Sequence, residues 1–249
     1  MSWGKSVTTV VRDARGMVTS ARMEDGSTIE ADVFIAADGH RSVVRNAIYP
    51  DLKLGSDRVH ELVCAIEAPD LVRSLNGKFL KFVDVKRALA VSIVPCSARS
   101  MVWFLQVDAA SVRFDGLDSS GRSSLVRELV GDWALPVLDL ILRTNFGRSY
   151  VWRTADMDRL PALAKGNLAF VGDSGHPLLP FTSQGVGSAL VDAVALGDMM
   201  DLFPNDIPTA FQCYSDERLP AVTALQRAGQ KLRRSFLDRG ASGEETATG

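Results

Sequence analysis

The stretch from Leu168 to Leu196 constrains the fold more than any other part of the 249-residue sequence. It reads LAFVGDSGHPLLPFTSQGVGSALVDAVAL and begins with a short apolar run of the kind that forms a buried strand. Gly172 and Asp173 end that run, and apolar residues recur at helical spacing after Gly185 and Gly187. An aspartate, a glycine loop and a helix N-terminus can together hold a hydroxylated, phosphorylated ligand, because the carboxylate accepts from hydroxyls and the N–H groups favour negative charge. An ordinary strand–turn–helix connection is the alternative interpretation.

Composition and charge exclude several classes of function. A net charge of -2 gives no electrostatic reason to expect a nucleic-acid partner. No apolar run approaches the roughly 20 residues of a membrane helix, and the N-terminus lacks the features of a secretory signal. The three cysteines and three histidines are too scattered for a disulfide framework or a metal cluster. We therefore expect a cytoplasmic protein without metal, membrane or nucleic-acid partners.

The first 58 residues predict a strand meander that leads into a buried strand. Strands are expected at 6–11 and 17–23, and the apolar run 31–37 predicts a central strand buried on both faces. This run ends at Asp38 and Gly39, and a short helix is expected over 42–47. The first strand has no obvious partner, which suggests that sequence is missing before it.

The middle of the chain differs in character from its flanks. Strands are expected at 60–66, 79–85, 88–95 and 100–107, forming an antiparallel sheet, followed by helices at 119–130 and 135–145. The last part predicts an α/β arrangement and then a tail expected to be disordered. Its expected elements are strands at 151–155 and 168–171, a helix at 186–202, and a helix at 208–237 kinked at Pro220.

Two motifs in this order resemble those of the FAD-dependent aromatic hydroxylases, the single-component flavoprotein monooxygenases of the para-hydroxybenzoate hydroxylase type. The family's DG motif has an apolar strand before Asp-Gly and then Ser and Arg, and it is matched by Asp38, Gly39, Ser42 and Arg45. Its GD motif is matched by Gly172, Asp173, His176, Pro180, Gln184, Gly185, Asp192 and Ala193. A Tyr-x-x-x-Arg-x-Pro pattern of the following helix is matched by Tyr214, Arg218 and Pro220.

The resemblance covers nearly the whole chain and implies its domain organisation. It implies a mixed α/β and α+β fold, the rear part of a para-hydroxybenzoate-hydroxylase-like FAD-binding fold with an inserted antiparallel substrate-domain sheet. The expected parts are a partial FAD-binding domain at 1–58, a substrate domain at 59–150, the remaining FAD-binding domain at 151–240, and a disordered tail at 241–249.

The resemblance also implies roles for the motif residues. Asp173, beside Gly172, is expected to bind the ribityl hydroxyls of FAD. The backbone of Gly185, Val186 and Gly187 is expected beside the flavin pyrimidine ring, where N–H groups stabilise negative charge. Pro180 is expected beside the isoalloxazine, and Asp38, Gly39 and Arg45 near the pyrophosphate and the approach of NAD(P)H.

Three motif residues also have structural interpretations. Arg45 is equally compatible with a structural ion pair to Asp38. His176 is expected to be a hydrogen-bonded loop residue rather than a proton shuttle. Asp192 is expected to be a helix-surface or packing residue.

The implied activity is that of an FAD-dependent monooxygenase that hydroxylates or epoxidises a small organic, aromatic substrate with NAD(P)H and O2. Because the chemistry belongs mostly to the cofactor, no catalytic side chain is expected, and the protein must exclude water and orient the substrate. Substrate contacts are expected from the sheet over 60–107. The candidates are Trp103, Phe104, Phe79, Phe82 and, outside that span, Arg153; for each of the four aromatic residues a position in the core is the favoured alternative.

The sequence departs from the family pattern in two places. The family begins with a GxGxxG unit for the ADP half of FAD, and these 249 residues contain no such motif. We therefore expect an N-terminally truncated chain with weak FAD binding and an exposed apolar face or edge, completed by a missing N-terminal piece or a partner chain. Ser183 also replaces the first glycine of Gly-Gln-Gly, which costs on the order of 1 kcal/mol if that position needs a positive φ.

Two alternatives remain open. The first is a non-catalytic fragment or pseudoenzyme with weak flavin binding, which the missing glycine-rich unit favours. The second is a relative of the flavin-dependent halogenases or reductases, which share the GD loop. Halogenases carry a Trp-x-Trp-x-Ile-Pro segment, and Trp103 and Trp152 are isolated in this sequence.

Overall fold

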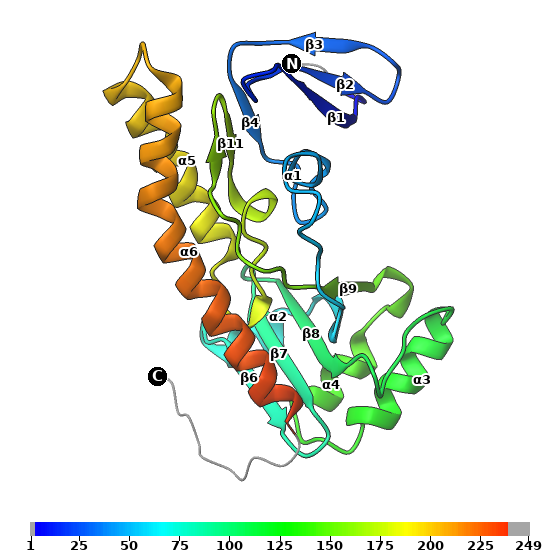
Figure 1. Cartoon of the computed structure of the whole chain (residues 1–249). Coiled ribbons are helices and arrows are strands. Elements are labelled where there is room, and N and C mark those ends of the chain that lie inside the picture. Colours follow the sequence, from blue (N-terminus) through cyan, green and yellow to red (C-terminus); the bar gives the residue numbers. More distant parts are fainter. Residues whose placement is uncertain (1–2, 239–249) are drawn as a thin grey trace. The chain divides into compact units, whose positions relative to one another are not determined.

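A computed structural model describes residues 3–238, and the chain divides into two compact units (Figure 1). The first unit combines the chain up to Ser56 with Ala155–Arg233. The second unit contains Asp57–Thr154 and the described residues that follow Arg233. The tail predicted to be disordered, 241–249, lies outside the described residues.

The first unit begins with an antiparallel sheet in the order β1-β2-β3. The predicted first strand therefore has a partner, β2, and a third strand completes the meander. Asn167 ties this sheet to the rest of the unit: its amide accepts from the Val18 N–H and donates to the carbonyls of Val18 and Asp32, at 2.8–2.9 Å. The strands are β1 (Val7–Arg12), β2 (Val18–Met23) and the unpredicted β3 (Thr28–Glu30).

A second small sheet places the two motif loops side by side. Its order is β10-β11-β4, with β10 (Ala164–Lys165), β11 (Leu168–Phe170) and β4 (Phe34–Ala36). Strands β11 and β4 are parallel, so both end at the same edge of the sheet. The prediction of a central strand buried on both faces at 31–37 is wrong: β4 is a three-residue edge strand, and Ile35 is 50% exposed. The apolar run is present, but among the described residues only β11 pairs with it.

Three helices complete the first unit. The N-terminus of α1 (Val43–Ile48) is capped by Ser42, whose Oγ accepts from the Arg45 N–H at 2.9 Å. α5 (Gly185–Leu202) and the long α6 (Ile207–Leu237) run beside each other in Figure 1. Pro220 lies inside α6, which continues on both sides of it. None of the helices within residues 3–238 combines the length and apolarity needed to cross a membrane.

The second unit is built on a five-stranded antiparallel sheet in the order β6-β7-β8-β5-β9. Alternate residues of the three central strands face one core, as the period of two in a strand requires. Leu62, Leu105 and Val91 lie opposite one another across these strands, and all three are buried. The strands are β5 (Val59–Glu67), β6 (Leu80–Asp84), β7 (Leu89–Pro95), β8 (Ser100–Asp108) and β9 (Tyr150–Thr154), close to the predicted ranges.

Helices cover this core face of the sheet. α3 (Ser119–Val130) matches its predicted range, whereas α4 (Val137–Arg143) is shorter than expected. A further helix, α2 (Pro69–Leu75), was not predicted. Val126, Val130, Leu140 and Ile141 pack into the core with the central strands.

Candidate functional site

The DG loop leaves β4 and turns immediately into α1. Gly39 has φ +79°, a left-handed conformation that glycine adopts without strain, and this turn allows Ser42 to cap the helix. The Asp38 carboxylate accepts from the Val44 N–H at 3.2 Å while its residue remains exposed. The loop is therefore held from within, and an acidic side chain stays at its surface.

Arg45 joins the DG loop to the GD loop. Its side chain is buried, and Nη1 donates to the carbonyls of Ser174 at 2.9 Å and Asp173 at 3.2 Å, while Nη2 donates to the His40 carbonyl at 2.6 Å. The sequence also allowed a structural ion pair between Arg45 and Asp38. In the described structure, no hydrogen bond joins these two side chains. Burial lowers the pKa of the Arg45 guanidinium, and the nearby carboxylates of Asp38 and Asp173 oppose that effect.

The GD loop is also fixed to the end of β4 through the Ala36 carbonyl. This oxygen accepts from the Val171 N–H at 3.0 Å and from the Ser174 hydroxyl at 2.6 Å. Gly172 has φ +58°, and a Cβ added there would lie 3.0 Å from the Cβ of Ala189. Glycine is therefore required at this position both for the backbone conformation and for the close approach of α5.

Asp192 organises the buried side of the GD loop. It is fully buried, and its carboxylate accepts from the Gly172 N–H at 2.8 Å and from Arg218 Nε at 2.8 Å, and faces Nε2 of His176. Of the two predicted roles of Asp192, the helix-surface position is wrong and the packing role is correct, because three motif elements converge on this buried carboxylate. Burial alone would raise the pKa of Asp192, but its bonds to His176, Gly172 and Arg218 outweigh burial and lower it. His176 is hydrogen-bonded within the loop, as predicted.

Residues of α6 form hydrogen bonds to the two elements that flank the GD loop, β11 and α5. Arg218 Nη2 donates to the Ser188 hydroxyl at 3.3 Å, and the Tyr214 hydroxyl donates to the Phe170 carbonyl at 2.7 Å. Burial raises the pKa of the Tyr214 phenol well above its usual range, so it stays a neutral donor. The Tyr-x-x-x-Arg pattern thus has a structural purpose: it holds the end of β11 and the start of α5 together.

The outer side of the GD loop presents polar groups that the protein leaves unused. The Asp173 carboxylate accepts no hydrogen bond from residues 3–238 and is only partly buried. The first N–H groups of α5, from Gly185 to Gly187, have no partner within the helix, and no described side chain caps them. A Cβ on Gly185 would meet no atom within 4 Å, so space is open beside these donors. A ligand that carries both hydroxyl donors and acceptor atoms fits this arrangement.

Pro180 and Ser183 shape the turn before α5. Pro180 begins a single 3-10 turn, Pro180–Thr182, and Ser183 follows with φ +53° and ψ 22°. The position therefore does need a left-handed backbone, so the predicted strain at Ser183 is present.

Two buried polar residues of this site were missed in the sequence. Ser174 is not singled out by the sequence motifs, yet its hydroxyl links β4 to the GD loop, and no spacing signals that contact. Asn167 follows Gly166, which has φ +62°, and forms the turn of the unpredicted β10–β11 hairpin. The Gly-Asn pair is a turn signal that could have located this hairpin.

The residues predicted as candidates for substrate contact lie in the second unit, and their side chains differ in burial. Trp103 is fully buried in the helix-covered core, where its Nε1 donates to Thr144 Oγ1 at 2.9 Å, so the core alternative is correct for this residue. Phe82 packs against the same core, whereas Phe104 is half-buried and Phe79 is exposed. Arg153 forms an ion pair with Asp115 at a pocket of this unit.

The paired loops have a defined geometry: two parallel strands end in an Asp-Gly turn and in a Gly-Asp loop that precedes a helix N-terminus. The sequence pattern of the FAD binding domain family matches residues 1–228. The chain belongs to this family, and the resemblance to the FAD-dependent aromatic hydroxylases is confirmed.

Relatives of known function are similar over most of this chain. A 3-amino-4-hydroxybenzoate 2-monooxygenase from Streptomyces platensis is 27% identical over 219 residues, covering 86% of this chain and 54% of its own. An FAD-dependent urate hydroxylase from Klebsiella pneumoniae is 28% identical over 236 residues, covering 93% of this chain and 58% of its own. The crystal structure of Klebsiella pneumoniae HpxO complexed with FAD and uric acid is 26% identical, with a TM-score of 0.81 over 95% of this chain and 59% of that one. The chain thus spans about half the length of the curated relatives it matches.

Proposed function

We propose that this chain forms the flavin-holding part of an FAD-dependent monooxygenase that uses NAD(P)H and O2 to oxygenate a small aromatic compound. The relatives named above act, by their names, on an aminohydroxybenzoate and on urate, both flat ring compounds, which supports this substrate class. The observation that carries the proposal is the set of unused polar groups on the outer side of the GD loop. On the inner side of the loop, by contrast, Arg45 and Asp192 form the hydrogen bonds that hold it.

When bound, FAD would supply the redox chemistry, and the residues described above would hold it. The Asp173 carboxylate would accept hydrogen bonds from ribityl hydroxyls. The N–H groups at Gly185, Val186 and Gly187 would face an electron-rich edge of the ring, where the positive end of the α5 dipole stabilises negative charge. Pro180 would limit the access of water from the side of the loop. Gly172, Asp38, Gly39 and Arg45 would fix the spacing of the two loops.

A large apolar surface of the first unit is proposed as the docking site for a further polypeptide segment. Val186, Leu190 and Val194 follow one another at helical spacing along α5 and are 79%, 64% and 64% exposed. A helix that is apolar on opposite faces is normally buried on both. The edge strand β4 pairs in parallel with β11 alone among the described strands, and its Ile35 is also exposed. A parallel α/β unit carrying a glycine-rich phosphate loop would cover both features and bind the adenosine half of FAD.

Flavin titrations of the purified chain test this proposal. Affinities for FAD and riboflavin are measured by flavin fluorescence, in wild type and in an Asp173→Asn variant. Because Asp173 and α5 face only the ribityl–flavin half, both ligands should bind weakly and with similar affinity. Asp173→Asn should weaken both about tenfold, the cost of losing a charged hydrogen-bond acceptor.

The matched control is Asp201→Asn, which changes an exposed aspartate on the far end of α5 and should leave both affinities unchanged. Stoichiometric FAD retained through purification, or FAD binding far tighter than riboflavin, would contradict the need for a further segment. Flavin binding that is insensitive to Asp173→Asn would contradict the assigned site. No detectable binding of either flavin would favour a non-catalytic fragment.

A further inference from the structure

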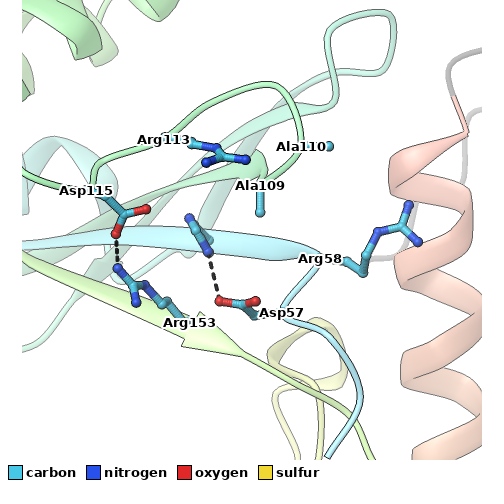
Figure 2. A pocket seen from close by; sticks show the side chains of 8 residues that line it. Asp57, Arg58, Ala109, Ala110, Arg113, Asp115 and Arg153 are labelled. Carbon is cyan, nitrogen blue, oxygen red and sulfur yellow. Dashed lines mark hydrogen bonds and ion pairs between the residues drawn. The ribbon is translucent and has the colours of Figure 1, made fainter.

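The second unit contains a charged pocket of about 300 Å³ that is independent of the GD loop and of the proposed flavin function (Figure 2). It lies where β5 begins and where β8 and β9 end. Its charged lining consists of three arginines and two aspartates, which leaves one positive charge in excess. The residues are Arg58, Arg113, Arg153, Asp57 and Asp115, together with His60.

The framework of the pocket is rigid. His60 and Arg153 are directly opposite each other on the adjacent strands β5 and β9, so their side chains share a face of the sheet. The loop after β8 is fixed at its start, because the Asp108 carboxylate accepts from the Ala110 N–H at 2.9 Å. It is fixed again by Phe114, which is buried in the core of the unit. Arg113 and Asp115, on either side of Phe114, are therefore held at the pocket.

The positive groups are only partly neutralised. Arg153 is paired with Asp115, and Asp57 Oδ2 lies 3.1 Å from Nε2 of His60. Arg58 and Arg113 make no ion pair or hydrogen bond through their guanidinium groups within residues 3–238. In Figure 2 the guanidinium of Arg113 lies across the pocket from the Arg153–Asp115 pair, while Arg58 extends away at the rim.

His60 supplies a second observation. Its side chain is almost fully buried, and its Nδ1 has no hydrogen-bond partner among the described residues. Buried polar atoms without partners are few in native proteins, and a bound ion, an ordered water or a functional role are among the explanations for them. A pocket that combines such a group with unpaired guanidinium groups is organised for a ligand rather than for stability.

We propose that this pocket binds a small oxyanion, the carboxylate or phosphate group of an organic molecule, between Arg113 and Arg153. All three cationic groups are guanidinium groups, whose planar set of donors matches the oxygens of carboxylate and phosphate. One excess positive charge is neutralised by one bound negative charge. The methyl groups of Ala109 and Ala110 leave room beside the anion for the body of a small molecule.

Titration of the full 15N-labelled chain with sodium benzoate and, separately, with inorganic phosphate tests the proposal, at an ionic strength held constant with chloride. The amide signals of Ala109 and Ala110 are expected to shift saturably with at least one of the two anions. The anion that binds more tightly identifies the source as a carboxylate or a phosphate compound. Absence of saturable shifts with both anions would overturn the proposal.

Three variants separate a built site from general attraction to positive charge. Arg113→Gln should weaken binding about tenfold, since it removes a charged donor. Asp115→Asn should strengthen binding severalfold, because it frees Arg153 from a competing carboxylate. Arg73→Gln, an exposed change on α2 of the same unit, should have no effect. Equal weakening by Arg113→Gln and Arg73→Gln, or unchanged affinity in Asp115→Asn, would overturn the proposal. These outcomes do not depend on flavin binding by the first unit.

Discussion

The guanidinium of Arg45 donates to the main-chain carbonyl of Ser174 at 2.9 Å and so joins two loops that lie 129 residues apart in the sequence. The same side chain reaches the carbonyls of Asp173 and His40. One buried cation therefore sets the distance between the DG and GD loops. The free carboxylate of Asp173 owes its position to this contact, since its own main-chain carbonyl accepts from Arg45.

Replacing Arg45 should remove the contact between the DG and GD loops and destabilise the protein. We expect Arg45→Met to lower the free energy of unfolding by about 3 kcal/mol, because one buried carbonyl and two partly buried carbonyls would lose a charged donor. Urea denaturation measures the effect. Arg41→Met, an exposed change in the same loop, should cost far less, and equal losses in both variants would contradict a special role for Arg45.

Asp192 should make stability dependent on acid pH. Its pKa is lowered in the folded protein, so its contribution is fully present above the unfolded value of about 3.9 and is lost as the pH falls through the lower folded value. We expect the wild type to lose more stability between pH 6 and pH 3 than Asp192→Asn does. Urea denaturation at both pH values, with the exposed Asp198→Asn as control, measures the difference; a control that behaves like Asp192→Asn would refute the assignment.

The substitution Asp192→Asn should also lower the free energy of unfolding at neutral pH. Asp192→Asn leaves the buried guanidinium of Arg218 without its carboxylate, and breaking one side of a buried ion pair costs about 3–5 kcal/mol. A loss below about 1 kcal/mol at pH 7 would show that the site relaxes to solvate Arg218.

Alanine substitutions at Gly172, in the GD loop, and at Gly197, in α5, should change the stability in opposite directions. Gly172→Ala should destabilise the protein by about 2 kcal/mol, because φ is +58° and the new Cβ would collide with Ala189. Gly197→Ala, inside α5 with no atom near the new Cβ, should instead stabilise it by about 0.5–1 kcal/mol. Thermal or urea denaturation of both variants gives the signs, and two changes of the same sign would contradict the described backbone.

Ser183 offers a stabilising change at the site itself. Since its φ is +53°, Ser183→Gly should raise the free energy of unfolding by about 1 kcal/mol. Ser56 is exposed and is not among the residues with a positive φ, so Ser56→Gly should slightly lower the free energy of unfolding. Urea denaturation distinguishes them; no gain at Ser183 would show that the hydroxyl or the local turn compensates for the strain.

Most of the secondary structure could be predicted from local patterns in the sequence. The strands of the second unit follow from alternation, as in Leu62, Cys64 and Ile66, because successive side chains of a strand point to opposite faces. The start of α1 follows from Ser42, because a hydroxyl there satisfies a free N–H group. Short elements such as β3 and α2 were missed, because few residues give little periodic signal.

The residues of the two loops could be assigned from the sequence, because the DG and GD motifs are local and occur in a fixed order. The same local patterns predict that Asp173 and the N-terminus of α5 hold a hydroxylated ligand. The three-dimensional fold was needed to show that Arg45 binds carbonyls rather than Asp38, and that Asp192 is buried among His176, Gly172 and Arg218. Those assignments depend on which partners the fold brings within hydrogen-bond reach, and residues 16 to 129 positions apart meet through strand pairing and helix packing that no local pattern encodes.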